Sequence, residues 1–330
     1  MILRYLNEPI YLGQFNYQLG ALRWDLDELK AKDLLAGEVG TLRELGYQYC
    51  LGLDRDETLL SLTRVPLSQT LNGTLPNAIV AQHCLTDSAV LPYDKDDRSV
   101  ETRNRYFTAA LMRELQLDHV PYFCSFASGC AGFLSLASIV AGLFSSPDVQ
   151  VAVCFMADSR PPKVTFDMLR ERILGSDHSS AFLAARHPLH YQLLGINYYS
   201  TARTLVPLFE IVKRTVQMTR ELATSLDLNL AERDVVIHYP NIFPETWNMV
   251  TRYLRLPRLE PVLDQMAERA HCGATDSVIT LAKMYGNQPG RVHIVVNYGI
   301  GLHLVVCILR EVAISEANGA GAPGRNGQGS

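Results

Sequence analysis

The sequence predicts a layered α/β fold assembled from two similar halves. Short runs rich in Val and Ile alternate with longer segments whose apolar residues recur at helical spacing. Strands that are apolar throughout are typical of sheets covered by helices on both faces. Because this alternation occurs twice along the chain, we infer an internal duplication.

The individual elements follow from the same patterns. The first half predicts strands at 77–85, 120–127, 149–158 and 179–186, and helices at 103–115 and 130–144. The second half predicts strands at 234–240 and a strand pair within 291–312, and helices at 205–226, 244–256 and 275–285. The run 130–144 holds no charged residue, so we expect a helix that is buried on all sides. The halves are expected at 1–175 and 176–312, followed by a disordered tail at 313–330 that is rich in Gly and Ala.

Composition excludes several classes of function. The chain has 330 residues, of which 48% are hydrophobic, and this is enough for a large core. The net charge is −4 and there is no basic tract, so a nucleic-acid partner is not expected. The N-terminus lacks a signal-peptide pattern, and the longest apolar run, 131–144, is too short to span a bilayer. We therefore expect a cytoplasmic protein without a membrane partner.

The cysteines indicate reduced thiols. There are seven of them, none in a CxxC spacing, and no secretion signal accompanies them. Two His–Cys pairs are adjacent in the sequence, His83–Cys84 and His271–Cys272, and no CxxC spacing accompanies either of them. No metal site is therefore expected.

Cys130 is the first candidate for catalysis. It stands where a predicted strand ends and a predicted helix begins, between Gly129 and the pair Ala131 and Gly132. Unpaired N–H groups and the positive end of the helix dipole favour a thiolate at this position, which would make Cys130 a nucleophile. The alternative is a small buried apolar residue, a common role of free cysteine.

His238 is the candidate partner of this thiolate. It follows an apolar strand and precedes Pro240, so we expect it at the C-terminal end of a strand, where the sites of α/β proteins gather. Asn241 is three residues further on and could orient the loop. A purely structural role is the alternative for His238, and His83 and His178 are its nearest rivals.

Four motifs together resemble a known family. The stretches "SGCAGF", "GSDHSSAFLA", "HYPN" and "NYGIG" follow the order and spacing of the thiolase superfamily. They most resemble β-ketoacyl-acyl-carrier-protein synthase III and its acyltransferase relatives, over about residues 1–312. The resemblance implies a five-layered αβαβα fold made of two pseudo-symmetric halves, and a homodimer.

The resemblance also implies the chemistry. Cys130 would carry an acyl group as a thioester, and the donor would be coenzyme A or the phosphopantetheine arm of an acyl carrier protein. No cofactor would be bound permanently. In the family, a backbone N–H of the C-terminal glycine turn and that of the nucleophile form an oxyanion hole, which implies Gly299 and Cys130 in this chain.

One departure from the family separates two reactions. Where the family has G-N-T-S, this chain reads "HCGATDSV", so Gly273 matches the glycine and Ala274 replaces the asparagine. In a decarboxylating synthase that asparagine stabilises the enolate together with the histidine. Asp276 could instead orient His238 and complete a Cys-His-Asp triad. Its alternative role is that of an N-cap or first-turn acid of the helix that follows.

These residues favour an acyltransferase that moves an acyl group through Cys130 to an alcohol or amine acceptor, in specialised metabolite biosynthesis. One alternative is a decarboxylating β-ketoacyl synthase, which forms a carbon–carbon bond at the same site. The other is a non-catalytic subunit on a thiolase-like scaffold.

Overall fold

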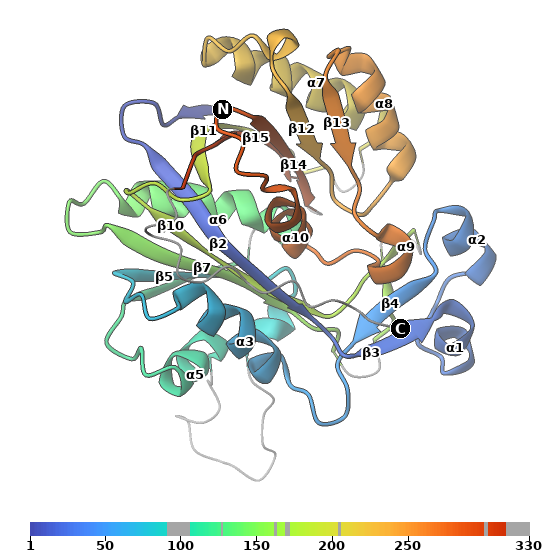
Figure 1. The fold of residues 1–330 in the computed structure, drawn as a ribbon. Coiled ribbons are helices and arrows are strands. Elements are labelled where there is room, and N and C mark those ends of the chain that lie inside the picture. The colour runs from blue at the N-terminus through green and yellow to red at the C-terminus, as the bar shows by residue number, and fades with distance from the viewer. Residues whose placement is uncertain are drawn as a thin grey trace.

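Two sets of five strands with the same internal order form the centre of the protein (Figure 1). The computed structural model describes residues 1–90, 106–126, 128–161, 164–168, 172–203, 206–299 and 303–314. The first set has the order β6-β5-β7-β10-β2, and the second has the order β13-β12-β14-β15-β11. Numbered along the chain within each set, both orders read 3-2-4-5-1. This repeated topology is what an internal duplication produces.

The strand bounds show how the sets meet. The first set comprises β2 (Ile10–Leu19), β5 (Ala78–Gln82), β6 (Tyr122–Ser125), β7 (Val151–Asp158) and β10 (His178–Ala185). The second comprises β11 (Tyr191–Ser200), β12 (Val235–His238), β13 (Leu259–Val262), β14 (Val292–Gly299) and β15 (His303–Glu311). A short antiparallel pairing of β2 with β11 joins them, and β1 (Ile2–Arg4) pairs with β11. Two small sheets stand apart, β3 (Leu22–Asp25) with β4 (Tyr49–Gly52) and β8 (Asp167–Met168) with β9 (Ile173–Leu174).

Helices cover both faces of each set. The longer ones are α3 (Leu59–Leu71), α5 (Phe107–Glu114), α6 (Gly132–Leu143), α7 (Leu208–Ser225), α8 (Pro244–Leu254) and α10 (Thr275–Met284). Helices α6 and α10 share one apolar core with strands of both sets, so they form a middle layer (Figure 1). The pair α3 and α5 packs on the outer face of the first set, and the pair α7 and α8 packs on that of the second. The predicted αβαβα layering is confirmed.

Short helices complete the chain. They are α1 (Leu26–Ala31), α2 (Val39–Glu44), α9 (Met266–Arg269) and the single turns η1 (Thr86–Ala89), η2 (Gly129–Ala131) and η3 (Leu230–Glu232). None of the helices in the described ranges combines the length and the apolar character needed to cross a bilayer.

The apolar strands reflect this layering. In β10, Phe182 and Ala184 join the middle core, whereas Ala181 and Leu183 face the outer layer. Side chains alternate between the two faces of a strand, and here both faces are covered. For this reason the strand is apolar at every position from Ala181 to Ala185 instead of at every second one.

The boundary between the halves differs from the one predicted at 175/176. Strand β10 lies between β2 and β7, so that division would cut the strand away from both of its partners. The strand order places the change of repeat between Ala185 and Tyr191. The helix predicted at 103–115 begins at Phe107 in the described residues, and positions 315–330 of the predicted tail lie outside them.

Candidate active site

The turn that carries Cys130 lies between β6 and α6. Cys130 is the middle residue of the single turn η2, two positions before Gly132 begins α6, and is only 8% exposed. The Nε2 of Gln82, at the end of β5, donates to the Gly129 carbonyl at 2.9 Å. A Cβ on Gly132 would stand 2.1 Å from the Cδ of Gln82, so a larger residue would displace this amide from the Gly129 carbonyl. The sequence prediction for the placement of Cys130 is confirmed.

Gly299 reaches the same turn from the second half. It ends β14, and a Cβ at this position would stand 2.2 Å from the carbonyl oxygen of Ser128. A side chain would therefore collide with the backbone that holds Cys130. The structure brings together the two residues whose N–H groups are predicted to form the oxyanion hole.

A buried carboxylate organises the opposite wall of the site. Asp276 lies in the first turn of α10 and is 1% exposed. Its oxygens accept from His271 Nδ1 at 2.6 Å, from the backbone N–H of Asn241 at 2.9 Å and from that of Cys272 at 3.2 Å. The guanidinium of Arg269 is a further partner, through a buried ion pair. Burial raises the pKa of Asp276, but Arg269 and His271 outweigh this and hold it well below its ordinary value.

Cys130 and His271 shift each other's pKa. A hydrogen bond from Cys84 and the charge of His271 hold the pKa of Cys130 well below its ordinary value, although burial opposes them. Burial tends to lower the pKa of His271, but Cys130 and Asp276 raise it to about 10. At neutral pH the pair is therefore thiolate and imidazolium. No partner with regular hydrogen-bond geometry meets His271 Nε2 within the described residues, and catalytic contacts often tighten only when substrate binds.

His238 does not form the predicted pair with Asp276. Its Nε2 lies 2.9 Å from Nδ1 of His293, and His293 Nε2 lies 2.8 Å from the Glu311 carboxylate. Burial, followed by His293 and Arg291, lowers the pKa of His238, so the ring is neutral. His238 does lie at the end of its strand, as its sequence context predicts. Its side chain, however, contacts His293 on the inner face of β12 and β14 and not Asp276. Asp276 orients His271 instead.

The supporting residues have distinct roles. The side chain of Asn241 donates to the carbonyls of Asp264 and Ala270, at 2.8 and 3.0 Å, and so fixes the loop whose N–H reaches Asp276. Gly273 has a φ of +53° and lies against His178, where a Cβ would stand 2.8 Å from Nε2. Ala274 is fully buried in the middle core, which leaves little room for the larger asparagine of the family.

Two residues of this site were missed by sequence reasoning. His271 opens the segment "HCGATDSV" and precedes Asp276 by five positions, but it was considered only as a metal ligand. Cys84 follows β5, and no motif marked it. The rival His178 does lie in the site, beside Gly273, and burial lowers its pKa to about 3.

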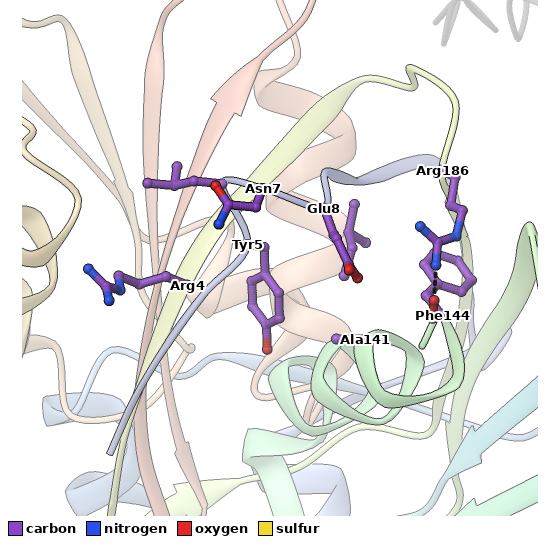
Figure 2. Close-up of a pocket in the computed structure, with 9 residues that line it drawn as sticks. Arg4, Tyr5, Asn7, Glu8, Ala141, Phe144 and Arg186 are labelled. Atoms are coloured by element: carbon purple, nitrogen blue, oxygen red, sulfur yellow. Dashed lines mark hydrogen bonds between the residues drawn. The ribbon is translucent and has the colours of Figure 1, made fainter. Parts of the chain in front are cut away.

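A cavity of about 450 Å³ lies elsewhere in the molecule (Figure 2). The N-terminal segment lines it with Arg4, Tyr5 and Glu8, and the C-terminal end of α6 closes it at Phe144 (Figure 2). Arg186 donates to the Phe144 carbonyl there. Cys130 precedes the opposite end of α6, about 18 Å away at the helical rise per residue, so this cavity is not the candidate active site.

Comparisons with known proteins agree with this fold. No protein-family model and no curated protein matches the sequence. Among solved structures, 3-oxoacyl-[acyl-carrier-protein] synthase III from Aquifex aeolicus matches with a TM-score of 0.68 and 13% identity, over 91% of this chain and 99% of that chain. An acyltransferase, ChlB3, matches with a TM-score of 0.73 and 15% identity, over 92% and 98% of the two chains.

A third structure shows the same similarity. OleA from Xanthomonas campestris, solved with lauric acid and lauroyl-CoA, matches with a TM-score of 0.67 and 13% identity, over 92% of this chain and all of that chain (100%). The protein therefore has the thiolase-like fold of these enzymes. At such low identity the similarity establishes the fold alone.

The first prediction distinguishes the two histidines. In His271→Gln the cation beside Cys130 is lost, so the pKa of the thiol rises. We expect alkylation of Cys130 by iodoacetamide at pH 6.5 to slow by about tenfold for each unit of that rise. In His238→Gln the rate should stay within about twofold of the wild type, because His238 contacts His293 instead. Peptide mass spectrometry measures both rates. A slower reaction in His238→Gln than in His271→Gln would instead support His238 as the partner of Cys130.

The second prediction concerns Asp276→Asn. Removing this charge leaves the buried Arg269 without its closest partner, so we expect a loss of about 3–5 kcal/mol in the free energy of unfolding at pH 7. A simple first-turn acid would cost only about 1 kcal/mol. Because the pKa of Asp276 is lowered in the folded state, its contribution is present above the ordinary value of 3.8 and is lost as the pH falls below it. Urea unfolding at pH 7 and pH 3 should show a smaller difference between the two proteins at pH 3.

Proposed function

We propose that the protein transfers an acyl group from a thioester donor, through Cys130, to an alcohol or amine acceptor. The observation that carries this proposal is the Cys130–His271–Asp276 arrangement, in which a thiolate faces a histidine whose other nitrogen is held at 2.6 Å by a buried carboxylate. This is the geometry of nucleophilic acyl transfer assisted by a general acid and base.

The first half-reaction loads the enzyme. The Cys130 sulfur attacks the carbonyl carbon of the donor thioester, and the donor's carbon–sulfur bond breaks as the new one forms. The imidazolium of His271 supplies the proton that the departing thiol of coenzyme A or phosphopantetheine requires. The N–H groups of Cys130 and Gly299 face the developing oxyanion.

The second half-reaction releases the acyl group. Neutral His271 takes the proton from the acceptor hydroxyl or amine as its oxygen or nitrogen attacks the acyl carbon. The Cys130–acyl bond then breaks, and the thiolate and imidazolium are restored together. Asp276 keeps Nδ1 protonated throughout, so that Nε2 faces the reacting atoms.

Ala274 supports transfer over decarboxylative condensation. A malonyl-type donor that loses CO₂ leaves an enolate oxygen that needs hydrogen-bond donors, and alanine supplies none. Removing one donor of this kind typically costs about 10²- to 10³-fold in kcat. The burial of Ala274 in the middle core fits a site built for transfer.

The third prediction tests this function directly. Incubation with a panel of acyl-coenzyme A and acyl-carrier-protein donors should add one acyl mass, and peptide mapping should place it on Cys130. The Cys130→Ala variant should gain no mass. Addition of alcohols or amines to the loaded enzyme should then remove the acyl group. Release of CO₂ from a malonyl thioester would favour the synthase, and no added mass from any donor would favour a non-catalytic subunit.

A homodimer is part of the proposal. Strand β6 ends the first set, and among the described residues it pairs only with β5. Tyr122, Phe123 and Phe126 are 43%, 43% and 44% exposed there. An apolar edge strand is normally covered, since an exposed one invites aggregation. Pairing of β6 with its copy about a twofold axis would cover it and continue the sheet across both subunits.

The fourth prediction follows from this edge. Light scattering of the wild type at micromolar concentration should give about twice the monomer mass of 36.8 kDa. Phe123→Lys should shift the mass toward the monomer, because a charge cannot be buried unpaired in an apolar interface. Val65→Lys, at an exposed apolar residue of α3, is the matched control and should leave the dimer intact. A wild type of monomer mass would contradict the proposal.

A further inference from the structure

A second thiol lies beside the nucleophile. The backbone N–H groups of Cys84 and Leu85 each donate to the Asp158 carboxylate at 2.8 Å, which fixes this loop at the end of β7. The Nε2 of Gln82 lies 3.7 Å from the Cys84 sulfur, and it also donates to the Gly129 carbonyl. One amide thus ties Cys84 to the turn that carries the nucleophile.

The opposite wall leaves room for this thiol. A Cβ on Gly273 would stand 3.2 Å from the Cys84 sulfur, so a larger residue would crowd it. The sulfur consequently lies between the Gln82 amide and the backbone of Gly273, with the Cys130 sulfur within hydrogen-bonding range. Cys84 is partly exposed as a residue.

Two adjacent thiols cannot both ionise easily, because two negative charges would repel each other in a buried site. The pair therefore shares one proton, and the surroundings decide which sulfur keeps it. Cys130 lies at the positive end of α6 and beside His271, whereas Cys84 lies beside Asp158. The hydrogen bond to Cys130, followed by burial, raises the pKa of Cys84 well above its ordinary value.

We propose that Cys84 is a positioning residue, which donates its thiol hydrogen bond to the Cys130 sulfur and so holds the nucleophile as a thiolate. The inference rests on the proposed function in taking Cys130 as the nucleophile. Acylation of Cys130 removes the negative charge and weakens this hydrogen bond. Departure of the acyl group restores it, so Cys84 favours the second half-reaction, in which Cys130 is the leaving group.

Other titratable groups surround the pair and bear on its protonation. They come from several elements and are His271 and Asp276 beside α10, Asp158 on β7, His178 on β10 and Tyr298 on β14. Burial raises the pKa of Asp158 to about 7. The test must therefore compare variants over a range of pH, so that a shift of the Cys130 titration is separated from the titration of Asp158.

The fifth prediction is a pH profile of Cys130 alkylation by iodoacetamide, followed on its own peptide. Cys84→Ala should move the profile to higher pH and slow the reaction at pH 6 by about tenfold or more, since a hydrogen bond to a charged group is lost. Cys84→Ser keeps a donor and should restore most of the rate. Cys154→Ala, which removes a buried thiol of the middle core, is the control and should match the wild type.

The reciprocal experiment keeps the test decisive if the Cys84 variants do not fold. Each of two coupled groups shifts the pKa of the other. Cys130→Ala should therefore lower the pKa of Cys84 and increase its alkylation rate at pH 7. An unchanged Cys130 profile in folded Cys84→Ala, or faster alkylation of Cys84 than of Cys130 in the wild type, would overturn the inference. Alkylation needs no acyl donor. A shifted profile in a protein that no donor acylates would therefore reject the proposed function and leave the role of Cys84 standing.

Discussion

The site depends on the burial of one carboxylate. Asp276 is 1% exposed, and a lone charge at that depth would be strongly destabilising. Four groups stabilise it: the Arg269 guanidinium, His271 Nδ1 and the N–H groups of Asn241 and Cys272. These groups come from the end of α9, the segment before α10 and the loop after β12. The need to give Asp276 these four partners therefore determines how the three segments are arranged in this wall.

The same carboxylate makes the charged pair of Cys130 and His271 possible. Arg269, Asp276, His271 and Cys130 carry alternating charges, positive, negative, positive and negative, so these four charges sum to zero. A single thiolate and imidazolium would be difficult to maintain where water is excluded. With Asp276 fixed, the imidazolium has an anion on each side, and this outweighs the effect of burial on its pKa.

The sequence predicted the layers and the position of Cys130 in its turn, but not which histidine lies beside it. Hydrophobic periodicity reveals a strand covered on both faces, and the small residues around Cys130 reveal a tight turn, because both signals are local. The position of a histidine at a strand end is also local, but the direction of its ring is not. In β12, Val235 and Ile237 face the outer helices, so alternation turns His238 to the inner face, toward His293 of the neighbouring strand. That contact depends on strand register, which one sequence does not give.

The duplication explains why the site forms where it does. Helices α6 and α10 occupy the same place in the two repeats, each between the third and fourth strands of its set, and both lie in the middle layer (Figure 1). Each begins beside a negative charge, the Cys130 thiolate at α6 and the Asp276 carboxylate at α10. A helix N-terminus stabilises an anion, and His271 lies between these two anions. The repeated topology therefore places two helix N-termini on either side of His271, and each of them favours the anion beside it.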